Sequence, residues 1–325
     1  MPVDLSPLDS HHDLLFEIPL KVRQGHRFQP TGFPDLGAAE FDTPSGRSLL
    51  VESAQSMANR LEAVCWDEGA NDLVEPLRGL SYVKVVDGSQ GFLTSSVLEA
   101  HRLNSAYIEK ASEPSCHDLI KHDIDVKKNR PIDRSKFIKT LLKYDAGSLL
   151  HGVFLESMDG RLRVARAVSA FIEADGVKTA ASGGVKNDRV QPGKDEVAGR
   201  SAKEGFGNLP FPRDEYTAKK ITLYVSVDLA QIRGYGLEKH ATDMLILLAL
   251  FKLRSFVDSP MRLRTACSFV KDDGDITGKN VSGFKLPSLP DVTSDLKELI
   301  AKLTEAKAFS GAKGITTAKF ATQAS

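Results

Sequence analysis

Residues 14–33 read LLFEIPLKVRQGHRFQPTGF, and they join a strand pattern to a loop of unusual composition. Apolar and polar side chains alternate over residues 14–22, which predicts a half-buried β-strand. Pro19 lies inside this alternation and favours an edge strand or a bulge. The run that follows, RFQPTGFPDLGAA (27–39), mixes a cation, amides and aromatic rings with turn residues. Such a loop can hold a phosphate, a base edge and a base face, although Gly and Pro clusters also mark ordinary surface loops.

The bulk composition bounds the class of protein. The chain has 325 residues, enough for one large domain or two small ones, and its 41% hydrophobic content is ordinary for a globular protein. Because 43 basic and 43 acidic side chains cancel, no global field draws it to nucleic acid or to a membrane. A basic groove balanced by acid elsewhere remains compatible with that sum.

Targeting and redox signals indicate a cytoplasmic protein. The N-terminus lacks a basic segment followed by an apolar one, so no signal peptide is expected. The longest apolar run, residues 244–251, is far shorter than the roughly 20 residues that span a bilayer. Three well-separated cysteines form no CxxC pair and suggest a reducing compartment; they are Cys65, Cys116 and Cys267.

Hydrophobic periodicity predicts alternating strands and helices along the rest of the chain. Ser48 is expected to N-cap a helix that runs to about Cys65. Strands are expected over residues 82–86, 149–156, 161–174, 221–229 and 261–270, and helices over residues 96–110, 133–144, 237–257 and 293–309. The second and third of these strands should form a hairpin. Residues 111–131 should be an exposed connection, and residues 310–325 a mobile tail without a core-forming pattern.

Residues 176–217 break this regularity, because they hold seven glycines and no sustained apolar period. A segment of this length inside a compact domain predicts a protruding hairpin or a flexible arm. Without insertions, the order is strand, helix, hairpin strands, strand, helix, strand. That order predicts an α+β, ferredoxin-like or RRM-like plan. A fold of this kind does not by itself establish a function.

Catalytic and metal patterns are weak in this sequence. His117 and His122 lie in a polar stretch without zinc-ligand spacing, and no P-loop or GxSxG motif occurs. Cys65 and Cys267 stand where core residues are expected. His26 is a lone histidine beside a basic loop and could serve as a general base only with suitable geometry. We therefore expect no cofactor and no metal.

RNA binding is better supported by the residue types. Arg23 and Arg27 can meet phosphates. Phe28 and Phe33 can either stack on bases, at about 1–3 kcal/mol per base, or brace the loop. The predicted helix has a polar face that either touches RNA or is merely solvated. The glycine-rich arm repeats cations and aromatic rings but is nearly charge-balanced, so a solvated loop is the alternative.

Several long motifs resemble a known family. They are RFQPTGFPDLGAAEF (27–41), LLVESAQSMANRLE (49–62), SLLHGVFLES (148–157), RVARAVSAFIEADG (163–176), ASGGVK (181–186), GFGNLPFPRDEYTA (205–218) and DLAQIRGYGL (228–237). Together they resemble the RAMP-type backbone subunit of subtype I-G (formerly I-U) CRISPR interference complexes, in the Cas-seven superfamily. The resemblance spans roughly residues 12–290.

This resemblance implies a single subunit over residues 1–309, followed by a flexible tail. Its parts are a palm (12–66 and 148–290), a partly helical insertion (67–147), a projecting β-hairpin thumb (about 177–217) and a C-terminal helix (293–309). Copies would polymerise along the spacer of a CRISPR guide RNA, with each thumb flipping one base. The implied partners are target DNA paired to the guide, a Cas-five/Cas-six-type subunit and a large subunit, with no membrane.

The resulting RNA-binding prediction covers the loop, the helix face, the arm and one later arginine. Its members are Arg23, Gln24, Arg27, Phe28, Gln29, Thr31, Phe33, Gln55, Ser56, Asn59, Arg60, Lys178, Ser182, Lys186, Asn187, Phe206, Phe211, Arg213 and Arg233. The protein is expected to be non-catalytic. A rival hypothesis is a RAMP-type ribonuclease that uses Asp35 or Asp42, as the resemblance to type III backbone subunits suggests. A stand-alone RRM-like module is the third.

Overall fold

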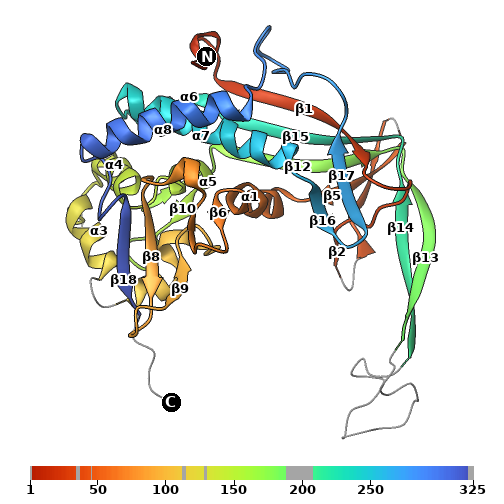
Figure 1. The fold of residues 1–325 in the computed structure, drawn as a ribbon, viewed down its shortest axis with the longest axis horizontal. Helices are drawn as coiled ribbons and strands as arrows, with labels where there is room; N and C mark the ends of the chain where they lie inside the picture. The colour runs from red at the N-terminus through yellow and green to blue at the C-terminus, as the bar shows by residue number, and fades with distance from the viewer. Residues whose placement is uncertain are drawn as a thin grey trace, which may run out of the picture.

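The computed structural model describes residues 2–33, 37–44, 46–111, 115–127, 130–187 and 208–320. These residues form an α+β fold around a seven-stranded antiparallel sheet of order β16-β17-β1-β15-β12-β5-β4 (Figure 1). Its strands are β1 (Asp13–Val22), β4 (Glu40–Thr43), β5 (Gly46–Glu52), β12 (Val168–Asp175), β15 (Lys220–Asp228), β16 (Met261–Arg264) and β17 (Cys267–Lys271).

The alternating strand predicted from residues 14–22 is confirmed as β1, but it does not lie at an edge. It pairs with β15 from Asp13↔Asp228 to Leu20↔Ile221, and with β17 at residues 20–22. The Pro19 carbonyl accepts the Asp272 N–H at 2.8 Å, just beyond the end of β17. Because N and O of one strand residue point to the same side, the missing Pro19 N–H falls where the ladder stops. An interior strand can therefore hold this proline.

Helices cover the apolar face of the sheet. Helix α1 packs on β12 and α7, and α7 in turn packs on α8. Helix α7 is apolar nearly all round and is correspondingly buried along its middle. The helices are α1 (Ala54–Ala63), α2 (Ala106–Glu109), α3 (Cys116–Ile124), α4 (Arg134–Tyr144), α5 (Ser148–His151), α6 (Leu229–Gly234), α7 (Lys239–Asp258) and α8 (Leu289–Glu305), with single 3₁₀ turns at Ser6–Leu8, Glu75–Leu77 and Arg102–Asn104.

The helix predicted from Ser48 begins later than expected. Residues 46–52 form strand β5, and Ser48 is buried with its Oγ donating to Asp175 Oδ1 at 2.8 Å. The N-cap is Ser53, whose Oγ accepts the Ser56 N–H at 3.3 Å. The apolar pairs of LLVE fit a helix or a strand equally well, and the neighbouring strand β12 decides between them.

Two other predicted strands are divided. Residues 149–156 begin as helix α5 and continue as β10 (Val153–Phe154), which pairs with β11 (Arg163–Val164) before β12 begins. Residues 261–270 form the hairpin β16–β17 rather than one strand. The helix predicted over residues 96–110 is reduced to a 3₁₀ turn and α2, whereas those at 133–144, 237–257 and 293–309 are confirmed with small shifts.

A second, smaller sheet of order β18-β8-β9 corrects two expectations. Its strands are β8 (Tyr82–Val86), β9 (Phe92–Ser95) and β18 (Ile315–Lys319), and β6 (Trp66–Asp67) pairs with β7 (Asp72–Leu73) beside it. The predicted mobile tail thus supplies β18, which runs parallel to β8 and buries Ala318. The predicted exposed connection, residues 111–131, contains α3 with buried Cys116 and Ile120. Both segments are too short to show a sustained apolar period.

The glycine-rich arm is a hairpin in its described part. Strands β13 (Lys178–Lys186) and β14 (Leu209–Thr217) pair from Lys178↔Thr217 to Lys186↔Leu209. They extend away from the main sheet (Figure 1). A Cβ on Gly183 would lie 2.7 Å from the Phe211 carbonyl oxygen, so this pairing requires glycine there. A further short ladder joins β2 (Gly32–Phe33) to β3 (Gly37–Ala38).

Two substitutions on β18 test its burial. Ala318→Asp should lower the free energy of unfolding by at least about 2 kcal/mol, because an unpaired carboxylate would enter the core. Thr317→Asp, one residue away on the exposed side, should change it by less than about 0.5 kcal/mol. Urea denaturation measures both. Equal effects would mean that β18 is not packed on β8.

Candidate nucleic-acid interface

The loop after β1 is fixed to the base of the arm by backbone hydrogen bonds. Phe28 N donates to Tyr216 O at 2.9 Å, and Tyr216 N donates back to Phe28 O at 2.8 Å. On the other side, Gln29 N donates to Ala266 O at 2.8 Å, in the turn between β16 and β17. The loop, the arm and this turn therefore form one rigid junction.

Phe28 anchors this junction instead of facing outward. Its side chain is fully buried, and its ring meets the ring of Phe269 edge-on at 5.6 Å. The prediction that Phe28 stacks on RNA is therefore wrong for this structure, because no face of the ring is accessible. The alternative use of this ring, bracing the loop, is the one observed.

Cations and amides of the loop line a pocket of about 710 Å³ at the junction. Arg23, Gln24, His26 and Arg27 form one wall, and Glu215 with residues 265–268 forms the rest. Arg23, Gln24 and Arg27 are exposed, so their polar groups are available to a ligand. The structure thus brings three of the predicted site residues to one concave surface, which we call the junction groove.

One buried carboxylate organises the cations of the groove. The Glu215 side chain is 7% exposed, and it pairs with Arg27 at 3.3 Å and with Arg213. Arg27 also donates to Ser182 Oγ at 3.4 Å, and Arg213 donates to Gln29 Oε1 at 3.3 Å. A buried acid that holds two guanidinium groups limits their rotamers. Arg27, Gln29, Ser182 and Arg213 are thereby joined in one network.

A second buried carboxylate, Glu52, ties α1 to the same region. It pairs with Arg60 at 3.0 Å and Arg264 at 2.7 Å, and it accepts a hydrogen bond from Ser56. Arg264 also donates to the Gln29 carbonyl at 3.3 Å. Ser56 and Arg60 therefore hold the protein together, while Gln55 and Asn59 remain exposed on the polar face of α1.

The arm places further predicted residues beside the groove. Lys178, Lys186 and Asn187 are exposed along or just beyond β13. Phe211 is 46% exposed, and its ring lies over Gly184, the residue that it opposes across the hairpin. Phe211 is thus an accessible aromatic surface on the arm.

The remaining predicted residues are elsewhere or outside the described part. Arg233 donates to Leu8 O at 2.6 Å and His11 O at 2.7 Å, so it holds the N-terminal segment. Thr31 is half-buried and donates its N–H to Val51 O at 3.2 Å. Phe33 lies in β2, but its side chain is outside the described residues, as are Phe206 and the rival catalytic Asp35.

Two glutamates and one arginine that organise the groove region were not predicted from the sequence. They are Glu52, Glu215 and Arg264. Glu215 lies within the motif 205–218 and Arg264 lies in none of the quoted motifs, but neither was singled out, since the contacts of Glu215 with Arg27 and of Arg264 with Glu52 join segments distant in sequence. The four-residue spacing of Glu52, Ser56 and Arg60 was visible, and it could have indicated a mutual contact.

Cys267 and His117, whose side-chain types can act in catalysis, are both buried in this structure. Burial raises the pKa of the Cys267 thiol to about 12, so the thiol lining the groove stays protonated at neutral pH. His117 is buried rather than exposed, with Nε2 2.9 Å from Leu103 O. Across the described ranges, no cluster of three or more His, Cys, Asp or Glu could hold a metal ion.

Comparison with known proteins identifies one matching family. A model of the family described as CRISPR-associated protein GSU0053 matches residues 14–179, slightly more than half of the chain. No curated protein matches. Among solved structures, a chain of a "CRISPR RNA-guided surveillance complex, pre-nicking" is 14% identical, covers 90% of this chain and 88% of its own, and has a TM-score of 0.38. Csc2 of Thermofilum pendens is 10% identical, with coverages of 95% and 83% and a TM-score of 0.30.

In the part of the chain that the structure describes, no helix combines the length and apolar character needed to cross a bilayer.

Substitution of two phenylalanines distinguishes a buried, anchoring ring from an exposed ring at the interface. Phe28→Ala should lower the free energy of unfolding by about 3–5 kcal/mol, because it empties a fully packed site beside Phe269. Phe211→Ala removes the same ring from an exposed position and should cost less than about 1 kcal/mol. Urea denaturation of both variants provides the comparison. Similar losses would contradict the anchoring role of Phe28.

Proposed function

This chain belongs to the CRISPR-associated protein GSU0053 family, and we propose that it is the guide-RNA-binding backbone subunit of a type I interference complex. Membership confirms the family resemblance carried by the sequence motifs. The observation that supports RNA binding is the junction groove, where exposed Arg23 and Arg27 stand against the base of a projecting hairpin. Cations fixed on a rigid loop suit phosphate recognition without reading sequence.

The topology supports a ferredoxin-like palm. Four neighbouring strands of the main sheet, β17-β1-β15-β12, have the order 4-1-3-2 when numbered along the chain as first to fourth. Helix α1 lies between the first and second of them in sequence, and α7 between the third and fourth. This order supports a split βαβ arrangement. In this proposal β4, β5 and β16 extend the palm, and the hairpin β13–β14 is the thumb.

Repetition along the RNA accounts for the neutral charge of the chain. In the proposed assembly, copies bind side by side on the guide, so each copy needs only a few phosphate contacts. The guide then pairs with target DNA. The other proposed partners are a Cas-five/Cas-six-type subunit and a large subunit, in the cytoplasm.

We propose no catalytic step for this subunit. Asp42, one of the two carboxylates named in the ribonuclease hypothesis, is an exposed residue of strand β4, where it opposes Arg47. One carboxylate without partner ligands is a poor site for a catalytic metal ion. Regularly spaced cutting of complementary RNA by the magnesium-loaded assembly would contradict the non-catalytic role.

The first test neutralises the groove. Arg23→Gln combined with Arg27→Gln should reduce the guide RNA that co-purifies with the assembly, because two phosphate-facing charges are lost. The ratio of absorbance at 260 and 280 nm and gel analysis of the RNA measure this loss. The matched control is Lys297→Gln with Lys302→Gln, which removes two exposed, ion-paired charges on α8. Equal RNA retention by both double variants would refute the groove assignment.

The second test shortens the thumb. Deleting residues 180–212 should leave the main sheet folded, because β13 and β14 form a ladder of their own and the Phe28–Tyr216 contact is retained. Chemical probing of the guide RNA in the assembly should then lose its regular pattern of flipped bases. A deletion variant that unfolds, by circular dichroism, would show that the hairpin belongs to the core.

A further inference from the structure

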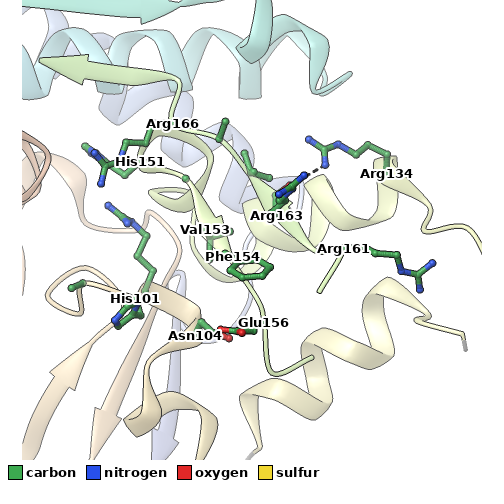
Figure 2. Close-up of a pocket in the computed structure, with 15 residues that line it drawn as sticks. His101, Asn104, Arg134, His151, Val153, Phe154, Glu156, Arg161, Arg163 and Arg166 are labelled. Carbon is green, nitrogen blue, oxygen red and sulfur yellow. Dashed lines mark hydrogen bonds between the residues drawn. The ribbon is translucent and has the colours of Figure 1, made fainter. Parts of the chain in front are cut away.

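A pocket of about 980 Å³ lies apart from the junction groove, beside the β10–β11 ladder (Figure 2). It is formed by the ladder, residues 100–104 and the first residue of α4. Figure 2 shows His151 and Arg166 at one end, Arg134 and Arg161 at the other, and Phe154 and Arg163 between them. Five arginines and one glutamate, Glu156, are the arginine and carboxylate residues of its lining. None of the lining residues belongs to the predicted RNA-binding set.

Three of these arginines have no acidic partner within the described ranges. Arg102 and Arg161 are neutralised by Glu62 at 2.6 Å and Asp159 at 2.7 Å. In contrast, Arg134, Arg163 and Arg166 form no ion pair among the described residues. Arg134 donates to the Arg163 carbonyl at 3.0 Å, and Arg166 reaches the Ala54 carbonyl only at 3.4 Å. The pocket therefore has an excess of positive charge over the acidic groups that the structure describes around it.

A buried histidine adds an unsatisfied polar group to this lining. His151 is 1% exposed, and neither of its ring nitrogens has a hydrogen-bond partner among the residues that the structure describes. Burial, with Lys252 and Arg102 nearby, lowers the pKa of His151 well below its usual value, so the ring is neutral. Unpartnered buried polar groups are rare in native structures and call for an explanation. A ligand that enters the pocket can supply the missing partner.

An exposed aromatic ring narrows the class of ligand. Phe154 is 45% exposed and lies directly opposite Arg163 in the β10–β11 ladder. Cations interleaved with an accessible ring are typical of sites for single-stranded nucleic acid, where phosphates meet the cations and a base stacks on the ring. A free phosphate ion has no base that could stack on the Phe154 ring, so it would leave this part of the pocket without a contact.

One glycine in the pocket lining, Gly152, permits the close approach of β10 and β11. Gly152 has φ +79, and a Cβ there would lie 2.9 Å from the Val164 carbonyl oxygen. Glycine thus allows β10 to pass close against β11, which sets Phe154 beside Arg163.

We propose that this arginine pocket binds a segment of single-stranded nucleic acid, with Arg134, Arg163 and Arg166 at its phosphates and Phe154 against a base. The source of the strand rests on the proposed function, as either guide RNA or unwound target DNA. Helix α1 connects the two sites, because Arg166 contacts its first residue, Ala54, while Arg60 on α1 and Arg264 near Gln29 share Glu52. A strand crossing α1 would therefore reach both.

The test titrates the full chain into a fluorescein-labelled 20-nucleotide RNA and a DNA of the same sequence, at several salt concentrations. Arg134→Gln combined with Arg163→Gln should weaken binding about tenfold. It should also reduce the slope of log K against log salt by about 1.4, at 0.7 per phosphate contact. Lys297→Gln with Lys302→Gln is the charge-matched control and should change neither value. Both arginines are exposed, so circular dichroism should show intact folding.

Phe154→Leu tests stacking separately from charge. It should weaken binding at least about fivefold without changing the salt slope, since it removes a ring and no charge. It should also reduce the quenching of 2-aminopurine placed in the oligonucleotide.

The outcomes separate this pocket from the proposed function. A loss confined to RNA or to DNA supports the pocket and identifies the strand. Unchanged affinity and salt slope in the Arg134/Arg163 double variant overturn the pocket, and if Arg23→Gln with Arg27→Gln still weakens binding, the groove stands alone. The reverse result supports the pocket and refutes the groove. Failure of the parent chain to bind either oligonucleotide overturns the pocket proposal.

Discussion

The geometry of the candidate interface depends on the two backbone hydrogen bonds between Phe28 and Tyr216. They fasten the loop after β1 to the base of the arm, and the buried Phe28 ring locks that loop against Phe269. Without this bridge, Arg27 and Arg213 would belong to separate surface segments. With it, both converge on Glu215, and the groove becomes a preorganised surface whose cations lose little entropy on binding.

Charge compensation distinguishes the two cationic surfaces. At the groove, Glu215 and Glu52 are buried, and each holds two arginines. These acids lower the local potential but fix the guanidinium positions. At the pocket beside β10–β11, three arginines have no acidic partner in the described chain. A net charge of zero therefore conceals a local excess that only the three-dimensional arrangement reveals.

Secondary structure was predicted correctly where an alternating or helical apolar pattern continued over many residues. Alternation placed β1 and β15, and an apolar helix pattern placed α7, within a few residues. It failed where the segment was short or ambiguous: Ser48 belongs to a strand because β12 pairs beside it, and residues 315–319 form a strand because β8 offers an edge. In the site, the loop cations were found from their residue types. The role of Phe28, stacking or bracing, could not be decided from the sequence, since its burial depends on Phe269, some 240 positions away.

The sequence alone determined the long strands β1 and β15, the helix α7, the position of the arm and the family of the chain, because these follow from local periodicity, glycine content and long motifs. Tertiary structure decided which residues are exposed at the two candidate sites. Arg233 and Phe28 turned inward, Glu52 and Glu215 became the centres of ion-pair networks, and Arg134, Arg163 and Phe154 met in one pocket. The physical reason is that burial and charge pairing depend on contacts between segments far apart in sequence, which no local pattern encodes.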